Sequence, residues 1–174
     1  MSLQGRPFES FVSKWGIPIL FLLHNVEESF GMTAFLGSQF GVYFISQRQF
    51  TGAIVLLTVS VFVLVWFFEK RTAFLLFVQG AIFFNAVQHV VLLLVLKQYN
   101  PGLVSACIIM ILFFASLSSI RPFLEKRTVL AILIGSLLAY PVVTWTALWL
   151  GGFLIKGEKS RPALDRLFSL LKQL

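Results

Sequence analysis

Two histidines and two neighbouring glutamates are the chemically reactive side chains that lie inside apolar stretches of this sequence. His24, Glu27 and Glu28 fall in one long apolar run, and His89 falls in another. An unpaired charge in hydrocarbon costs about 2.5–3.5 kcal/mol on insertion scales, so residues of this kind usually mark a functional site. The other acidic residues fall in polar connectors or terminal segments, at Glu9, Glu69, Glu125, Glu158 and Asp165. We therefore expect the four embedded residues to form the functional centre.

Helical spacing divides the polar residues of the two runs into two patches. Residues three and four apart on an α-helix share a face. That spacing occurs at His24, Glu27 and Glu28. It recurs in the second run at Asn85, Gln88 and His89. Both helices are expected to enter the membrane from the same side, and the two patches lie at similar depths along them. The spacing thus predicts that the patches meet near the middle of the bilayer.

The residue types in these patches favour a metal site. Imidazole and carboxylate groups suit Zn²⁺ or iron, and a divalent cation would offset the two negative charges. Side chains from facing helices form metal sites of this kind in helical bundles. We expect His24, His89 and Glu28 to be metal ligands. Glu27 is expected to be a further ligand or the catalytic general base.

Zinc is the preferred metal and iron the second choice. Carboxylate-bridged di-iron sites use four carboxylates and two histidines, whereas only two carboxylates are embedded here. A homo-oligomer could supply the missing ligands. Asn85 and Gln88 would support the site, either by hydrogen-bonding to the ligands or by contacting a substrate.

The composition places the chain in a membrane. Of its 174 residues, 58% are hydrophobic and 12% are charged, and the mean hydropathy is +0.90. Several runs of about 20 apolar residues predict an all-α, polytopic transmembrane bundle. The net charge of +7 is explained by membrane topology and by anionic lipid headgroups. No motif that combines aromatic and basic residues indicates a nucleic-acid partner, so membrane lipids are the expected partners.

We predict a single domain, residues 1–174, with five membrane crossings. The predicted helices cover about 15–36, 50–68, 72–96, 103–120 and 129–155. Residues 37–45 are interpreted as a loop or interfacial piece. Pro141 would either kink the last helix or divide it into a hairpin. The tail, residues 156–174, is predicted to form a basic amphipathic helix on the membrane surface.

Lysine and arginine positions favour a cytoplasmic N-terminus in a multi-pass plasma (inner) membrane protein. With five crossings, one side holds the N-terminus and the connectors at 69–71 and 121–127, which carry seven basic residues. The opposite connectors carry Arg48 and Lys97, so the positive-inside rule places the first side in the cytoplasm. The basic tail conflicts with this topology, because five crossings place it on the opposite side.

Three motifs together resemble the HXXEE-domain family of small bacterial membrane proteins. They are the His-x-x-Glu-Glu at 24–28, a second histidine at His89, and a Tyr-x-Pro-Gly motif at 99–102. The match covers roughly half of the chain and implies no activity, since we know of no established function for that family. The resemblance adds Tyr99 to the candidate site. Because it lies about 15 Å along the axis from His89, we expect it to shape the mouth of the cavity.

These observations predict a metal-dependent hydrolase or oxidase that acts on a lipid-like substrate. A proton- or cation-coupled carrier would use the same residues as a relay, and would show ion-dependent transport without a tightly bound metal. A structural or partner-binding membrane subunit is the third alternative, in which the cluster only fixes the packing of helices. The metal-dependent enzyme is the preferred hypothesis of the three.

Overall fold

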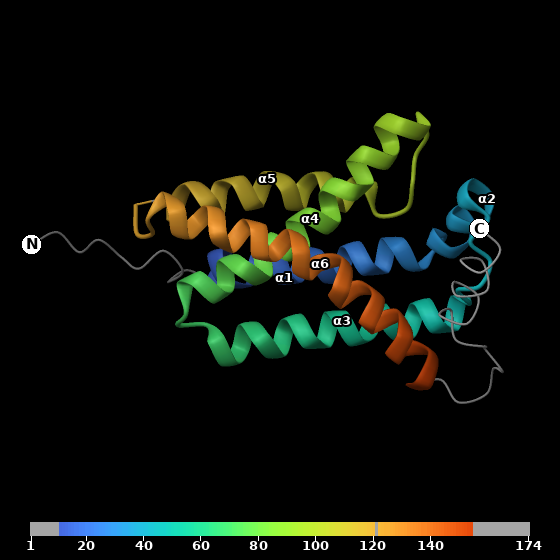
Figure 1. Ribbon diagram of the computed structural model, residues 1–174, viewed down its shortest axis with the longest axis horizontal. Helices are drawn as coiled ribbons and strands as arrows, with labels where there is room; N and C mark the ends of the chain where they lie inside the picture. The colour runs from blue at the N-terminus through green and yellow to red at the C-terminus, as the bar shows by residue number, and fades with distance from the viewer. Residues whose placement is uncertain (1–10, 121, 155–174) are drawn as a thin grey trace, which may run out of the picture.

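A computed structural model describes residues 11–120 and 122–154, and every regular element in this part of the chain is an α-helix. The helices are α1 (Phe11–Ser29), α2 (Met32–Phe40), α3 (Gln47–Phe68), α4 (Thr72–Leu96), α5 (Leu103–Ile120) and α6 (Lys126–Leu154). Figure 1 shows that α1, α3, α4, α5 and α6 run back and forth along one long axis, while short α2 lies at one end. The predicted all-α bundle is confirmed.

Four helices in the described part of the chain, α3, α4, α5 and α6, are long and apolar enough to cross a membrane. Helix α1 carries three charged residues and is not among them, but it packs in the same bundle against α3 and α5. Helices α1 and α4 run in the same direction, as predicted, whereas α3 and α5 run opposite to both (Figure 1). The two helices that carry the polar patches are therefore parallel.

The first predicted helix, residues 15–36, is wrong in its extent. Helix α1 ends at Ser29, and the chain turns at Phe30 and Gly31 before α2 begins at Met32. Gly31 has φ −178° and ψ −3°, which is not helical, and the Ser29 hydroxyl donates to the carbonyl of Val26 at 2.7 Å. The segment 37–45 is also partly helical, because α2 continues to Phe40.

The predicted helices at 72–96 and 103–120 agree with α4 and α5, and the boundaries of α3 and α6 differ by a few residues. Helix α3 begins at Gln47 because the Ser46 hydroxyl accepts a hydrogen bond from the Gln49 amide at 3.1 Å, a typical N-terminal cap. Helix α6 begins at Lys126 and continues through Pro141 without interruption, so of the two alternatives at that proline the single helix is right and the hairpin is wrong. The predicted amphipathic tail, residues 156–174, lies outside the described residues.

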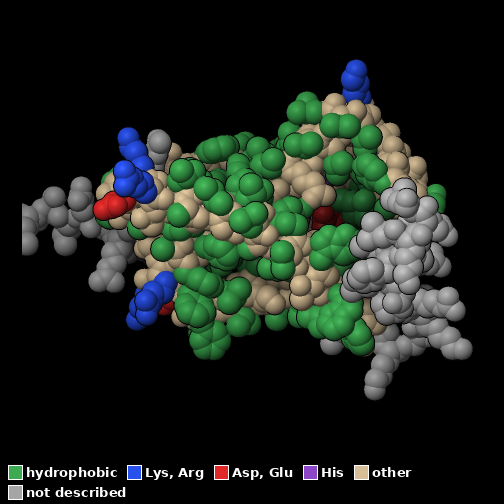
Figure 2. All heavy atoms as spheres, in the orientation of Figure 1, with side chains coloured by type: hydrophobic (Ala, Val, Ile, Leu, Met, Phe, Trp, Pro, Cys, Tyr) green, Lys and Arg blue, Asp and Glu red, His purple; other side chains and the backbone are tan. Residues whose placement is uncertain are grey.

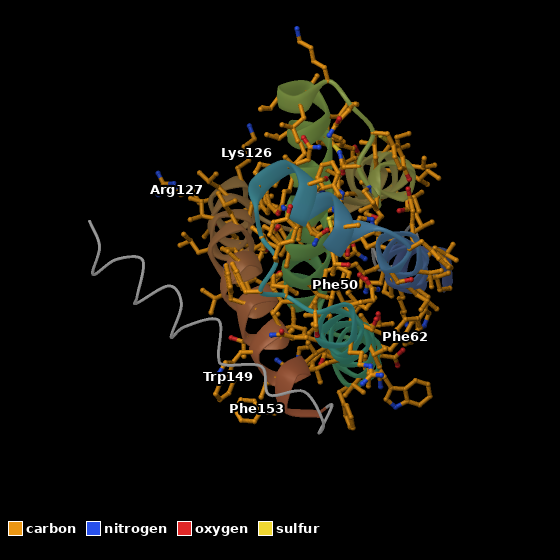
Figure 3. All side chains as sticks on the ribbon, turned by 90° about the vertical axis from the view of Figure 1, so that its right-hand side faces the viewer. Phe50, Phe62, Lys126, Arg127, Trp149 and Phe153 are labelled. Atoms are coloured by element: carbon orange, nitrogen blue, oxygen red, sulfur yellow. The ribbon has the colours of Figure 1, made fainter. Side chains whose placement is uncertain are left out.

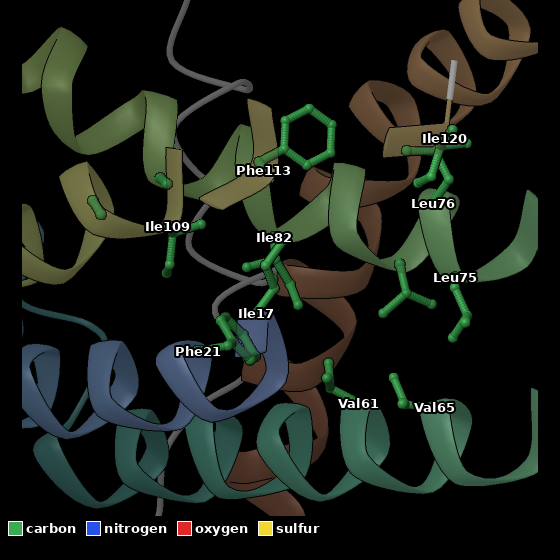
Figure 4. Close-up of a cluster of buried hydrophobic side chains, with 13 residues drawn as sticks. Ile17, Phe21, Val61, Val65, Leu75, Leu76, Ile82, Ile109, Phe113 and Ile120 are labelled. Atoms are coloured by element: carbon green, nitrogen blue, oxygen red, sulfur yellow. The ribbon is translucent and has the colours of Figure 1, made fainter. Parts of the chain in front are cut away.

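An apolar core fills one half of the bundle and joins α1, α3, α4 and α5. Figure 4 shows its labelled side chains converging from these helices, among them Phe21, Val65, Leu76 and Phe113. Helix α6 packs across α3 through Gly151, where an added Cβ would lie 2.6 Å from the Gln49 carbonyl oxygen. Small residues allow such close backbone contact between membrane helices. The core and this crossing hold the helices in fixed positions around the polar cluster.

The outer surface is apolar along the helices and charged at one end. Figure 2 shows hydrophobic side chains over most of the visible face, with most lysine and arginine side chains grouped at the end opposite α2. Trp149 and Phe153 point outward from α6 (Figure 3), and 46% and 61% of their surfaces are exposed. An apolar surface of this extent is expected for a chain whose helices are surrounded by lipid.

Candidate metal centre

Three predicted ligands converge at a single point between α1 and α4. His24 and His89 are 0% and 1% exposed, and Glu28 is 7% exposed. Glu28 Oε1 lies 3.0 Å from His89 Nε2 and 3.6 Å from His24 Nε2. One ligand atom from each of the three residues lies within 4.8 Å of the others, an arrangement that could hold a metal ion.

Asn100 fixes the orientation of the His89 ring. Its amide nitrogen donates to the His89 backbone carbonyl at 3.0 Å, which leaves its oxygen facing His89 Nδ1 at 2.7 Å. An amide oxygen only accepts hydrogen bonds, so His89 Nδ1 must carry the proton and donate it. The opposite ring nitrogen, Nε2, therefore faces Glu28, and in the neutral imidazole it carries the lone pair.

The ring of His24 is also held by hydrogen bonds, in this case to groups at the start of α5. His24 Nδ1 lies 3.0 Å from the Gly102 carbonyl oxygen and 3.0 Å from Ser105 Oγ. A carbonyl oxygen only accepts, so Nδ1 donates to it, and Nε2 is the ring nitrogen that faces Glu28 and Asn85. Histidines that bind metals usually donate the other ring N–H to an oxygen in this way, which fixes both tautomer and orientation.

The atoms that would bind a cation consequently face one another. They are the two Nε2 atoms and Glu28 Oε1, and Asn85 Oδ1 lies 2.9 Å from His24 Nε2. A cation would accept electron pairs from these atoms and compensate the charge of the Glu28 carboxylate. A tetrahedral ion bound at about 2.1 Å would separate its ligand atoms by about 3.4 Å. The measured separations of 3.0 and 3.6 Å lie on either side of that value.

Glu27 faces a different part of the molecule. Its carboxylate accepts hydrogen bonds from the Val104 amide at 3.2 Å, the Ser105 amide at 3.0 Å and the Ser105 hydroxyl at 2.6 Å. These amides belong to the first turn of α5, where backbone N–H groups lack partners within the helix and the helix dipole favours a negative charge. Glu27 therefore caps α5 from the neighbouring helix.

Tyr99 completes this cap. Its hydroxyl donates to Glu27 Oε1 at 2.7 Å, and 56% of its surface is exposed. The hydrogen bond to the carboxylate raises the pKa of the Tyr99 phenol above its ordinary value. The prediction that Tyr99 lies beside the cavity rather than at its centre agrees with this position.

Gly102 brings the connector between α4 and α5 directly onto the cluster. Its φ is +94°, a conformation that side chains disfavour, and an added Cβ would lie 2.7 Å from the His89 ring and 2.8 Å from the His24 ring. The connector thus returns from the end of α4 to the level of His89. It supplies Asn100 to one histidine and the Gly102 carbonyl to the other.

The comparison with known families agrees with this constellation. The family described as "Protein of unknown function with HXXEE motif" matches residues 15–117. The chain belongs to this family. Neither the curated proteins nor the solved structures contain a match.

The two glutamates of this HXXEE motif are separated by the fold. The first histidine and the second glutamate, His24 and Glu28, meet His89, whereas Glu27 is not brought into the cluster. Asn85 contacts His24, as expected of a supporting residue. Gln88 does not reach the site, because its side chain is on the exposed side of α4.

Three contributors to the site were not found from the sequence: Asn100, Gly102 and Ser105. The first two stood in a predicted turn, and nothing in the spacing indicated that the turn folds back onto the histidines.

Proposed function

We propose that this HXXEE protein is a membrane enzyme that binds one divalent metal ion through His24, His89 and Glu28. Zinc is the first choice and iron the second. The proposed reaction is hydrolysis, or with iron oxidation, of a lipid-like substrate. Catalytic zinc sites commonly have three protein ligands, including the combination of two histidines and one glutamate, with a fourth position open to water or substrate. The same ligand set with open positions also suits Fe²⁺.

The observation that carries the proposal is the direction of the four imidazole nitrogens. Both Nδ1 atoms donate to amide or peptide oxygens, and both Nε2 atoms face the Glu28 carboxylate. A metal ion accepts electron pairs from all three groups at once, and it compensates the charge of a buried carboxylate. The donor set thus fits a divalent cation.

Glu27 has no chemical step in this proposal. Both of its oxygens accept hydrogen bonds from α5 or from Tyr99, so its earlier assignment as ligand or general base is replaced by a structural one. Asn85 is a polar side chain beside the ligands that is available to orient a substrate.

A proton between Glu28 and His89 is the alternative to a metal ion, and it underlies the relay and structural hypotheses. The metal content of the purified protein distinguishes these two hypotheses from the metal-site hypothesis. Elemental analysis of the detergent-purified protein is expected to give close to one zinc or iron per chain. His24→Ala and His89→Ala should each lose the metal, while Gln88→Ala, an exposed neighbour on α4, should keep it. A wild-type protein that remains free of metal after incubation with zinc or iron would overturn the proposal.

We also propose that the N-terminus lies in the cytoplasm and that α4 and α5 are connected on the other side of the plasma membrane. The connectors at the N-terminal end carry more lysine and arginine than those at the other end. In a Cys107→Ser background, Lys97→Cys should react with an impermeant maleimide on intact cells, and Lys70→Cys should react only after lysis. The reverse pattern would invert the topology.

A further inference from the structure

The depth of the metal centre follows from the helix that begins beside it. Helix α5 has 18 residues and contains no charged side chain, and at 1.5 Å per residue it is about 27 Å long. The hydrocarbon core of a bilayer is about 30 Å thick. Helix α5 therefore crosses the core from end to end. Its first turn, which contacts Glu27 and His24, marks one boundary of the hydrocarbon.

A second helix gives the same level. Gln47, the first residue of α3, donates through its side-chain amide to the Ser29 carbonyl at 2.8 Å. Glu28 directly precedes Ser29, so the cluster is level with the first turn of α3 as well as that of α5. Two independent helix ends thus place the metal centre near the boundary between hydrocarbon and headgroups. The expected position near the middle of the bilayer does not agree with these helix lengths.

The face that α6 crosses is hollowed. Figure 2 shows an acidic side chain at the bottom of this hollow, which hydrophobic side chains surround. Of the Glu28 side chain, 10% is exposed, so its carboxylate is not completely enclosed. An apolar hollow at this depth is suited to a lipid that enters from the bilayer.

We infer that the substrate is a glycerolipid and that the scissile bond is a carboxylic ester between an acyl chain and glycerol. This inference rests on the proposed hydrolytic function. Glycerolipid ester groups lie at the boundary between hydrocarbon and headgroups, level with the cluster, while acyl-chain carbons lie deeper. Among the described residues, no lysine or arginine is hydrogen-bonded or ion-paired with the cluster, so a neutral ester fits better than an anionic phosphodiester.

The reaction consumes one water molecule. The water oxygen bonds to the ester carbonyl carbon, and the bond between that carbon and the glycerol oxygen breaks. One proton from water passes to the glycerol oxygen, and the other is lost as the fatty acid ionises. A metal ion at the cluster would polarise the carbonyl or the water. The products are a free fatty acid and a lysolipid.

Spin labels test the depth without reference to metal or activity. Val104 and Ile111 are exposed on α5, by 60% and 68%, and Ile111 lies about 12 Å past Leu103 along the helix. In a Cys107→Ser background, a nitroxide on Val104→Cys should collide mainly with a water-soluble nickel chelate. A nitroxide on Ile111→Cys should collide mainly with oxygen, which concentrates in the bilayer centre. The opposite order would overturn the depth.

Lipid products test the scissile bond. Zinc-loaded protein is reconstituted in vesicles of dioleoyl phosphatidylcholine and, in parallel, of its diether analogue, which lacks carboxylic esters but keeps the phosphodiester. Mass spectrometry should detect oleic acid and lysolipid from the first vesicles only, and Glu28→Gln should abolish both products. Choline or phosphocholine release from both lipids would overturn the ester assignment. Stoichiometric zinc with no product from either lipid would also overturn it, whereas failure to bind zinc would overturn the proposed function itself.

Discussion

Glu27 and Glu28 are neighbours in the sequence, yet the fold gives them different partners. Glu28 is 7% exposed and faces two imidazole nitrogens. Glu27 is partly exposed and accepts hydrogen bonds from the first turn of α5 and from Tyr99. A carboxylate among imidazole lone pairs favours a cation, whereas a carboxylate on a helix N-terminus already has its compensating charge in the helix dipole. One glutamate is suited to bind a metal and the other to stabilise the fold.

The comparison shows that spacing on a helix does not by itself assign a role. Residues at i+3 and i+4 share a sector of the helix, and for that reason both glutamates were candidate ligands. Adjacent helix positions differ by about 100°, so here one side chain meets α4 and the other meets α5. The partner helix decides the chemistry.

The largest expected effect is that of Gly102→Ala, which would disturb both histidines and Glu28 at once. The methyl group would meet both histidine rings, and the positive φ is unfavourable for alanine. We expect loss of zinc binding and a loss of about 2 kcal/mol or more in the free energy of unfolding. Zinc content and unfolding in mixed micelles measure the two effects.

Gly41→Ala is the matched control for this substitution. Gly41 has φ +66° with no atom within 4 Å of an added Cβ, so it carries the backbone cost without the collision. We expect it to retain zinc with a loss of about 1 kcal/mol. Equal zinc loss in both variants would show that the contact of Gly102 with the histidines is unimportant.

Asn100→Ala should weaken zinc binding at the cluster that contains Glu28 and leave the contacts of Glu27 unchanged. Without the Asn100 oxygen, His89 loses the acceptor that fixes its tautomer, and zinc affinity should fall about 10–100-fold. Competition with a chromophoric chelator measures the change. An unchanged affinity would mean that the orientation of His89 does not depend on Asn100.

The sequence predicted the residues on the helices better than those on the connector. His24, Glu28 and His89 could be predicted because helical spacing and burial follow from local patterns of charge and hydropathy. The roles of Asn100 and Gly102 depend on how far the connector folds back toward α1, which is a property of tertiary packing. The contact of Glu27 with the α5 N-terminus was not predicted for the same reason, because that N-terminus is distant in sequence.

Glu27→Gln should lower the stability of the protein by weakening the contact between Glu27 and the first turn of α5. Glutamine keeps an acceptor oxygen but loses the charge that interacts with the α5 N-terminus and with the Ser105 hydroxyl. The free energy of unfolding should fall by about 1–2 kcal/mol. Denaturation in mixed micelles tests this value, and a stability equal to that of the wild type would contradict the capping role.

Tyr99→Phe is expected to have the smallest effect. It removes one exposed hydrogen bond to Glu27, which contributes about 0.5 kcal/mol. Because the pKa of the phenol is raised in the folded state, the contribution is present below the ordinary tyrosine pKa and is lost as the pH rises through the folded value. Wild-type and variant stabilities should therefore differ at neutral pH and converge in strong alkali. A difference that persists there would indicate that Tyr99 stabilises the fold by packing.

The most direct test of the division of roles is zinc affinity in Glu28→Gln beside Glu27→Gln, with both proteins purified in the same detergent. The account predicts that Glu28→Gln binds no zinc at concentrations that saturate the wild type. It predicts that Glu27→Gln still binds one zinc per chain. Retention of stoichiometric zinc by Glu28→Gln, together with its loss from Glu27→Gln, would contradict the account and return Glu27 to the metal centre.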